Sequence, residues 1–185
     1  AKMARTATTF IDRNAYGGRN VRQEFARLLE SQKVPLDLVE VGCGVGTLTQ
    51  ELSSRNYFDR IRAFDTSELM ICEARAFSRK KEMMTEVEFD VRNACDLGSL
   101  RTGVAVSSFM MHELPTEAHV HVVRSLLECT RQVRGQVWIV DIDSTYVPSN
   151  AMLAGEPYLE AYIDQIDDTM FRIASTEKDV KLSTL

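Results

Sequence analysis

The stretch LVEVGCGVGT at residues 38–47 decides the fold of this chain. The apolar run over residues 36–41 predicts a short buried strand, and Pro35 ends the helical pattern before it. Three glycines at alternate positions follow, and they let the backbone turn sharply and approach a ligand because no Cβ stands in the way. A helical pattern resumes at Thr47, whose first turn leaves backbone N–H groups free to face a ligand. The stretch therefore predicts a strand, a tight turn with a binding site, and a helix.

The same alternation continues along the chain. Hydrophobic periodicity predicts strands over residues 36–41, 60–64, 86–91, 104–108 and 136–142. It predicts helices over residues 18–32, 47–55, 67–80 and 116–132, the third of them capped by Ser67. Strands that alternate with helices indicate an α/β fold, with a parallel sheet covered by helices on both faces. Ligands of such sheets bind beyond the carboxyl ends of the strands, near the point where strand order reverses.

Length and charge limit the classes of protein to consider. The chain has 185 residues, enough for a single domain, which we divide into an N-terminal helical segment (1–34), a binding core (35–146) and a C-terminal helix with its tail (147–185). Its 22 basic and 27 acidic side chains leave a net charge of −5, so we expect no nucleic-acid partner. No apolar run is long enough to span a membrane, and we expect a soluble, cytoplasmic protein.

Cysteine and histidine spacing predicts neither disulfides nor a metal site. The four cysteines are scattered without any C-x-x-C pair, and a domain of this size needs no disulfide to fold. His112-Glu113 lacks the second histidine, four residues on, that a zinc-protease helix requires.

An acidic residue follows the second predicted strand. Asp65 stands at that strand end, where a carboxylate can accept hydrogen bonds from both hydroxyls of a ribose. Taken alone, Asp65 would be interpreted as a solvated aspartate in a loop. The glycine turn lacks the Gly-Lys-Ser/Thr ending of a phosphate loop, and its third glycine comes one residue earlier than in a dinucleotide-binding turn. Turn and acid together indicate a nucleoside derivative as the ligand.

Three stretches resemble motifs of the class I S-adenosylmethionine-dependent methyltransferases. Residues 38–49 look like the first motif of this family, and residues 64–75 are similar to the second, with its acid, its Ser and its Met. Residues 104–115 resemble the fourth-strand motif of the small-molecule branch. The likeness covers residues 15–142 in the right order. It implies a Rossmann-like, doubly wound, mostly parallel sheet, with S-adenosylmethionine as methyl donor and S-adenosylhomocysteine as product.

The resemblance also implies which residues bind the cofactor. Gly42, Gly44 and Gly46 would pass beneath its methionine part. Glu40 would help to order that turn, and Asp65 would take the ribose hydroxyls. The other implied cofactor contacts are Cys43 in the turn, Thr66 and Met70 against the adenine, Asn93 and Ala94 at the adenine edge, and Ser108 and Phe109 beside the sulfonium. Asn93-Ala94 departs from the Asp-Ala that is frequent in the family, although an Asn still donates and accepts hydrogen bonds.

His112, just past the fourth predicted strand, is the candidate general base. Methyl transfer is an in-line displacement from an activated donor, so a base is needed only when the acceptor must lose a proton. Imidazole titrates near neutral pH when unperturbed. Glu113 lies beside His112, and Asp141 and Asp143 follow the fifth strand. The alternative is that His112 caps a turn or packs over the cofactor.

The acceptor class is narrowed by motifs that are missing. No Asp/Asn-Pro-Pro-aromatic stretch follows the fourth strand, which disfavours the amino group of a base or amide as the target. No Lys-Asp-Lys-Glu set for ribose methylation is recognisable. Together with the acidic balance, these absences favour a small-molecule acceptor. Two other functions stay open, a non-catalytic S-adenosylmethionine-binding partner or sensor module, and a nicotinamide-dependent oxidoreductase.

The C-terminal part is the least similar to the family. Apolar residues at helical spacing predict an amphipathic helix from Pro157 to residue 174. It either packs on the sheet as a core helix, or its Met152, Tyr158 and Tyr162 wall the acceptor pocket or line a contact in a possible homodimer. The antiparallel hairpin that normally ends the family's sheet is short or missing, since residues 180–182 are the only strand-like piece beyond that helix.

Overall fold

A computed structural model describes residues 19–80, 84–143, 145, 147, 150–155 and 157–176. Its strands are β1 (Asp37–Val41), β2 (Arg60–Asp65), β3 (Glu86–Val91), β4 (Val104–Ser108) and β5 (Gln136–Val140). Its helices are α2 (Val21–Ser31), α3 (Thr47–Ser54), α4 (Glu68–Ser78), the 3₁₀ turn η1 (Met111–Glu113), α5 (Thr116–Arg131), α6 (Asn150–Gly155) and α7 (Leu159–Thr176). All five predicted strands and all five predicted helices are present, whereas η1 and α6 were not predicted.

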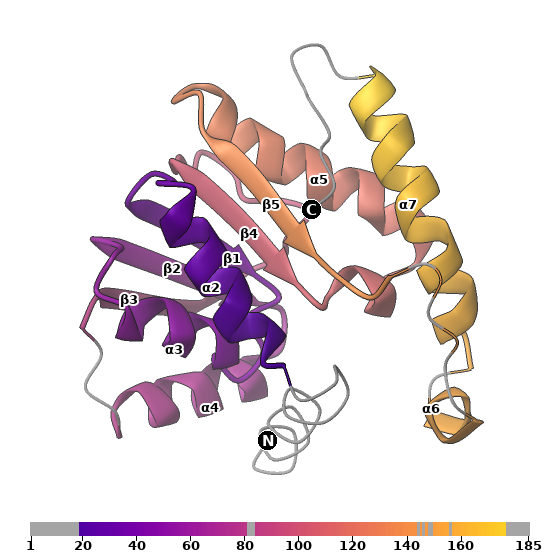
Figure 1. Cartoon of the computed structure of the whole chain (residues 1–185), viewed down its shortest axis with the longest axis horizontal. Coiled ribbons are helices and arrows are strands. Elements are labelled where there is room, and N and C mark those ends of the chain that lie inside the picture. Colours follow the sequence, from indigo (N-terminus) through magenta and orange to yellow (C-terminus); the bar gives the residue numbers. More distant parts are fainter. Residues whose placement is uncertain are drawn as a thin grey trace.

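The five strands form one parallel sheet in the order β3-β2-β1-β4-β5 (Figure 1). The chain builds the sheet outward from β1 to β3, then returns to the other side of β1 with β4. Strand order therefore reverses between β1 and β4, where a sheet of this type binds its ligand. The expected doubly wound, Rossmann-like fold is confirmed.

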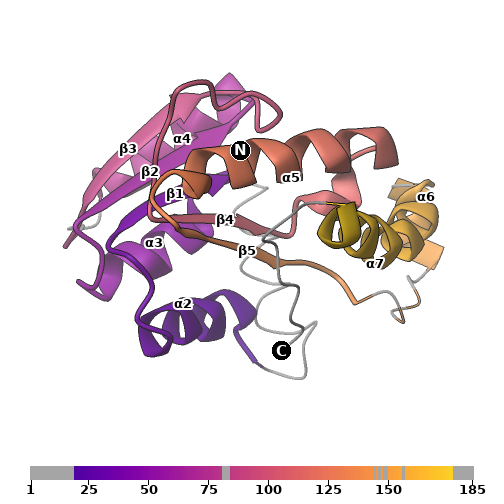
Figure 2. The same cartoon turned by 90° about the horizontal axis from the view of Figure 1, so that it is seen from above.

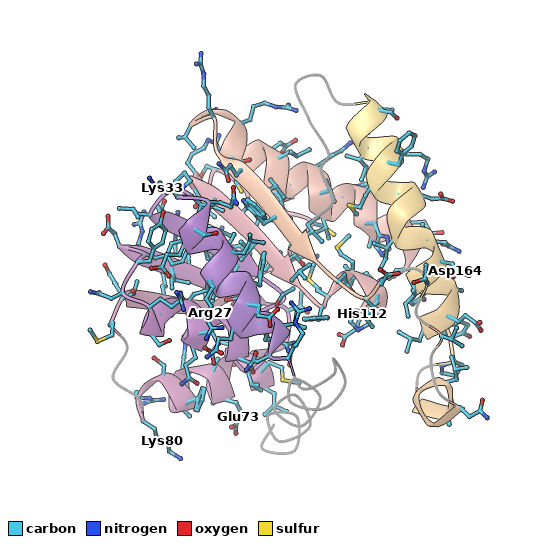
Figure 3. All side chains as sticks on the ribbon, viewed as in Figure 1. Arg27, Lys33, Glu73, Lys80, His112 and Asp164 are labelled. Carbon is cyan, nitrogen blue, oxygen red and sulfur yellow. The ribbon has the colours of Figure 1, made fainter. Side chains whose placement is uncertain are left out.

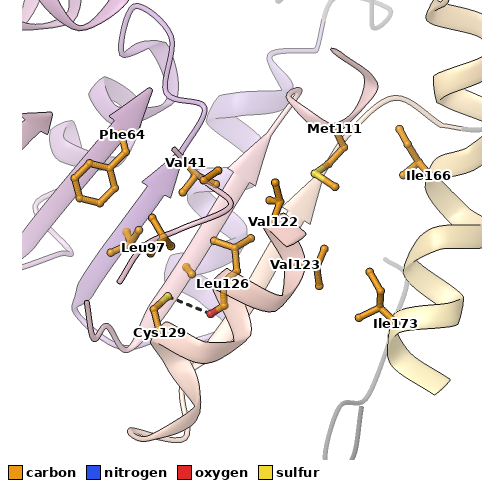
Figure 4. Close-up of a cluster of buried hydrophobic side chains, with 13 residues drawn as sticks. Val41, Phe64, Leu97, Met111, Val122, Val123, Leu126, Cys129, Ile166 and Ile173 are labelled. Carbon is orange, nitrogen blue, oxygen red and sulfur yellow. Dashed lines mark hydrogen bonds between the residues drawn. The ribbon is translucent and has the colours of Figure 1, made fainter. Parts of the chain in front are cut away.

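Helices cover both faces of the sheet. On one face, α2 and α3 pack through Phe25, Leu29 and Leu52 against strand residues that include Leu38 and Val106, and α4 packs beside them on β2 and β3. On the other face, α5 and α7 bury a second cluster over β1 and β4. Figure 2 shows α2 and α3 on the opposite side of the sheet from α5. In Figure 4 the side chains of this second cluster converge from the strands, from α5 and from α7.

The C-terminal helix is a core element, as one of the two sequence-based interpretations expected. Leu159, Ile163 and Ile166 of α7 are buried, and α7 contacts both α5 and η1. Tyr158, by contrast, is 69% exposed. The Met152 side chain and the strand-like residues 180–182 lie outside what the structure describes.

Capping side chains explain several element boundaries. The Asn20 side chain accepts a hydrogen bond from the Gln23 N–H at 3.0 Å and begins α2. Ser67 caps α4 as predicted, because its hydroxyl accepts from the Met70 N–H at 3.3 Å. The strand predicted to run to residue 142 ends at Val140, since the next side chain, Asp141, turns the chain toward η1.

No helix among the described residues is both long and apolar enough to cross a membrane. The four cysteines are free thiols. Within the described part of the chain, no three His, Cys, Asp or Glu side chains gather closely enough to hold a metal ion.

Candidate cofactor and acceptor site

The strand register brings the predicted site residues to one edge of the sheet. Val41 of β1 pairs with Phe64 of β2 and with Ser107 of β4. The next residue along each strand, Gly42, Asp65 or Ser108, therefore lies at the same level at the carboxyl end of the sheet.

The three glycines of the turn all adopt left-handed backbone angles. Their φ values are +66° at Gly42, +53° at Gly44 and +78° at Gly46, a region that side chains with a Cβ rarely enter. The turn is closed by the Cys43 N–H, which donates to the Phe64 carbonyl at 3.0 Å, and by the Gly46 N–H, which donates to the Cys43 carbonyl at 2.9 Å. Gly46 then caps α3. The sequence-based reason for these glycines is confirmed.

The space beside each glycine differs. A Cβ at Gly44 would meet nothing within 4 Å, so the backbone there is open to a ligand. A Cβ at Gly42 would lie 2.4 Å from the Met110 Sδ and 2.9 Å from the Met110 Cβ. Met110 follows β4, so this contact joins the two sides of the point where strand order reverses. The sequence singled out the glycine but not Met110.

Asp65 joins the turn to the end of β2. Its Oδ2 accepts a hydrogen bond from the Gly44 N–H at 2.8 Å, and its Oδ1 accepts one from the Ser67 N–H at 2.8 Å. An ionised carboxylate has about four acceptor positions, two on each oxygen. One position on each oxygen therefore remains, which is what two neighbouring ribose hydroxyls require.

Glu40 is fully buried beneath the turn. The Thr49 hydroxyl donates to its Oε2 at 2.6 Å, which ties β1 to α3. Burial raises the pKa of Glu40 to about 7, opposed by the Thr49 hydrogen bond and by the charge of Arg22. The carboxyl group therefore titrates in the neutral range and responds to any positive charge placed beside it.

Three other predicted cofactor contacts lie around the turn. Cys43 is buried, and burial together with the nearby Glu40 and Asp65 carboxylates raises the pKa of its thiol far above its usual range, so it is inert. Thr66 is exposed and Met70 is half-buried at the start of α4. Both lie within a few residues of Asp65 along the chain.

The Asn93-Ala94 pair, which we expect at the adenine edge, closely follows β3 at the carboxyl end of the sheet. Asn93 is exposed, but its side-chain oxygen accepts the Cys95 N–H at 2.9 Å and so closes a local turn. Ala94 belongs to the hydrophobic cluster beneath α5. The place of this pair at the adenine edge stays a prediction.

Ser108 and Phe109 end β4 beside the glycine turn. Ser108 is buried, and the Phe109 N–H donates to the Val140 carbonyl at 2.8 Å. Phe109 has a φ of +53°, which is costly for a residue with a Cβ and is typical of functional sites. The guanidinium of Arg22 lies 4.7 Å from the centre of the Phe109 ring, so α2 also contributes a cation here.

His112 is paired with Asp141 at the ends of β4 and β5. The His112 Nδ1 lies 2.6 Å from Asp141 Oδ1, and the exposed fractions of the two side chains are 11% and 4%. The other ring nitrogen, Nε2, lies 4.0 Å from Glu113 Oε1. Figure 3 shows His112 on the turn beyond the strand ends, on the side toward α7.

The η1 turn that carries His112 is held on two sides. Asp141 Oδ2 accepts the N–H groups of Met110 and Met111 at 3.1 and 2.7 Å. The buried His119 of α5 directs its Nε2 to the carbonyls of Met111 and Leu114 at 2.8 and 3.2 Å. The turn thus has little freedom to move relative to the sheet. The sequence already placed Asp141 directly after the fifth strand, as it placed Asp65 after the second, whereas Arg22 and His119 have no comparable signal.

The family model for a methyltransferase domain matches residues 38–132. No curated protein sequence gave a significant match. The family match spans β1 to the end of α5, and so includes the turn, Asp65 and His112.

Several solved structures of methyltransferases have the same fold. Magnesium protoporphyrin IX methyltransferase from Synechocystis PCC 6803 with bound SAM superposes with a TM-score of 0.60 at 16% identity, over 83% of this chain and 67% of that one. The methyltransferase domain of bacterial CtHen1 superposes with a TM-score of 0.66 at 17% sequence identity, over 83% of this chain and 82% of that one. An S-adenosylmethionine-dependent methyltransferase from Clostridium acetobutylicum ATCC 824 superposes with a TM-score of 0.60 at 14% sequence identity, over 80% of this chain and 61% of that one. The match to the Synechocystis enzyme with bound SAH covers only 50% of that enzyme.

The chain belongs to the methyltransferase domain family, and the class expected from its motifs, S-adenosylmethionine-dependent methyltransferase, is confirmed. The relatives do not share one acceptor.

Proposed function

We propose that this domain moves a methyl group from S-adenosylmethionine to a small-molecule acceptor. The observation that carries the proposal is the junction of the open Gly44 backbone with the Asp65 carboxylate, which keeps one acceptor position on each oxygen. This arrangement suits the ribose of a nucleoside and the chain that leaves it. The bound cofactor would supply an activated methyl group on a sulfonium.

Each group of site residues has a role in this proposal. Asp65 would orient the ribose, and Gly42, Gly44 and Gly46 would let the methionine part lie against the backbone. Thr66 and Met70 would border the adenine, with Asn93 and Ala94 at its edge. Glu40 and Cys43 would support the turn from below, and Ser108 and Phe109 would border the reacting sulfur.

The small-molecule acceptor is supported by charge and by α7. The net charge of −5 disfavours a polyanionic acceptor. The rings of Tyr158 and Tyr162 are stacked at 6.2 Å at the start of α7, a helix that contacts η1. A stacked aromatic pair, with Tyr158 exposed and Tyr162 half-buried, on the segment that contacts the turn with His112 is suited to holding a flat organic molecule.

Calorimetry with S-adenosylhomocysteine and with NAD tests the cofactor. We expect binding of the first and none of the second. Asp65→Asn should lower the affinity for S-adenosylhomocysteine about 100-fold, because charge-assisted hydrogen bonds to both ribose hydroxyls are weakened. The matched control, Asp59→Asn, changes an exposed loop aspartate before β2 and should bind like the wild type. Binding of NAD alone would establish the oxidoreductase instead.

Turnover distinguishes an enzyme from a binding module. A panel of small organic acceptors is incubated with S-adenosylmethionine, and products are identified by mass. A gain of one methyl group on any acceptor supports the proposal. Tight cofactor binding with no transfer to any acceptor class would favour the partner or sensor module.

A further inference from the structure

Glu40 places an acid inside the domain, beneath the turn that is proposed to hold the cofactor. It lies two residues before Gly42 at the end of β1, and only 1% of it is exposed. The Thr49 hydroxyl of α3 donates to its Oε2 at 2.6 Å. Because this donor is neutral, it supports the carboxyl group without cancelling the charge that ionisation would leave there.

Charges on three sides of the turn act on Glu40. Arg22 of α2 favours the ionised form, whereas the Asp65 carboxylate at the end of β2 opposes it. The Cys43 thiol of the turn stays protonated, because burial and both carboxylates raise its pKa. Burial is the largest influence and raises the pKa of Glu40 to about 7, so this group is partly ionised at neutral pH.

The sheet register relates Glu40 to the place proposed for the reacting sulfur. Glu40 pairs with Val106 of β4, and Ser108 lies two residues further along that strand. Side chains two residues apart on a strand point to the same face. Glu40 and Ser108 therefore share the face on which Leu38 and Val106 pack against α2 and α3.

Little water separates these two positions. With a rise of about 3.3 Å per residue and about 4.8 Å between strands, the Cα atoms of Glu40 and Ser108 are roughly 8 Å apart. Both residues are buried, so a charge placed beside Ser108 is only weakly screened from Glu40.

The two forms of the cofactor differ in charge at this place. S-adenosylmethionine carries a positive sulfonium, whereas the sulfur of S-adenosylhomocysteine is a neutral thioether. The ribose, the ammonium and the carboxylate are common to both ligands. A residue that responds to the sulfonium charge therefore distinguishes the methyl donor from its demethylated product.

We propose that Glu40 is a specificity-determining residue, whose ionised carboxylate attracts the sulfonium charge and so selects the methyl donor over the product. The inference rests on the proposed methyltransferase function and adds the residue that recognises the donor's charge. Opposite charges roughly 8 Å apart, at an effective dielectric constant of about 20, change a binding constant by on the order of 10-fold to 30-fold. Methyl transfer removes the positive charge, so the product is held less tightly than the donor.

Proton binding at Glu40 and donor binding must oppose each other. A positive charge in the site favours the carboxylate over the protonated acid, and by linkage the carboxylate favours the donor by the same factor. Since the pKa of Glu40 is about 7, the preference for the donor is small at acidic pH and grows as the pH rises through this value. A side chain that only supports the fold produces no such difference between the two ligands.

Calorimetric titration with S-adenosylmethionine and with S-adenosylhomocysteine tests the assignment. From about pH 5.5 to about pH 8.5, the Kd of the product divided by the Kd of the donor should rise about 5-fold to 10-fold in the wild type. Groups that affect both ligands equally, such as their common ammonium, cancel in this ratio. Glu40→Gln keeps the size of the side chain and should give a ratio that is independent of pH.

Further variants separate Glu40 from its surroundings. Thr49→Val removes the hydroxyl that favours ionised Glu40, so the rise in the ratio should move to higher pH. His112→Gln removes an imidazole, a group that titrates near neutral pH when unperturbed, and should leave the rise unchanged. Glu128→Gln, an exposed change on α5, should behave like the wild type.

Proton release gives a second readout that does not depend on the absolute affinities. Titrations near neutral pH in two buffers with different ionisation enthalpies count the protons that leave on binding. A 10-fold charge effect on a group that is half ionised predicts that the donor releases about 0.4 proton more than the product does. In Glu40→Gln this difference should disappear.

The outcomes separate this inference from the proposed function. A ratio that does not change with pH in the wild type overturns the role of Glu40, even if Glu40→Gln does not fold. A rise that persists in Glu40→Gln, or that disappears in His112→Gln, assigns the charge effect to another group and also overturns it. In these cases both ligands still bind and the methyltransferase function stands, whereas binding of neither ligand overturns that function as well.

Discussion

The two halves of the site are built by different means. On the β1–β2 side, glycines at residues 42, 44 and 46 allow the backbone to adopt left-handed angles without strain. On the β4–β5 side, Phe109 adopts a similar angle despite its Cβ, at a cost of about 1–3 kcal/mol. There the geometry is held by buried side chains, Asp141 and His119. The conformation of the β1–β2 half is therefore set by backbone preferences, whereas that of the β4–β5 half depends on tertiary contacts.

The largest effect is expected where the two halves touch. Gly44→Ala should lower the free energy of unfolding by about 1–2 kcal/mol, the cost of a Cβ at a left-handed position. Gly42→Ala should cost about 1–3 kcal/mol more, because its Cβ also collides with Met110. Urea unfolding of both variants gives the difference.

A double-mutant cycle checks the cause of that difference. In a Met110→Ala background, Gly42→Ala should cost no more than Gly44→Ala does in the wild type. If the excess persists without the Met110 side chain, the two halves do not meet in the way described, and strain within the turn explains the whole effect.

The next effect concerns the buried acid beneath the turn. The pKa of Glu40 is raised to about 7 in the folded chain from an ordinary value of 4.5, so the folded state binds more protons between these values. Its contribution to stability is therefore complete below about pH 4.5 and is lost as the pH rises through about 7, amounting to about 3 kcal/mol. Glu40→Gln should remove this loss, so the variant gains on the wild type between pH 5 and 8.

Denaturant unfolding at a series of pH values measures this gain. Glu128→Gln, an exposed change on α5, is the control and should follow the wild-type curve. Parallel curves for the wild type and Glu40→Gln would show that the carboxyl group is ionised throughout, and that Arg22 and Thr49 outweigh its burial.

The smallest effect is expected at Tyr158, directly before α7, where we propose that the acceptor binds. Tyr158→Ala should raise the acceptor KM several-fold with the panel of small organic acceptors and leave S-adenosylhomocysteine affinity unchanged, because it removes one ring of the Tyr158–Tyr162 stack. Its effect on stability should be about 1 kcal/mol or less. Phe171→Ala, within α7, is the matched control, since Phe171 and Tyr158 are both 69% exposed. An unchanged KM would assign the tyrosine pair to another contact.

The β1–β2 half of the site was largely predictable from the sequence. Hydrophobic periodicity placed the strands to within one or two residues, and the glycine turn and Asp65 were both identified. One strand boundary was missed for a physical reason: β5 ends early because the Asp141 side chain takes over backbone hydrogen bonds.

What the sequence by itself determined was the alternating α/β pattern, the turn after β1 and the acid after β2, since each depends on local backbone preferences. The tertiary structure alone decided that Met110 covers Gly42 and that Asp141 orients His112. These partners lie far apart along the chain, and they meet only because β4 inserts between β1 and β5 in the sheet. Strand order is a property of the whole fold, so no local pattern could have specified which side chains the strand ends bring together.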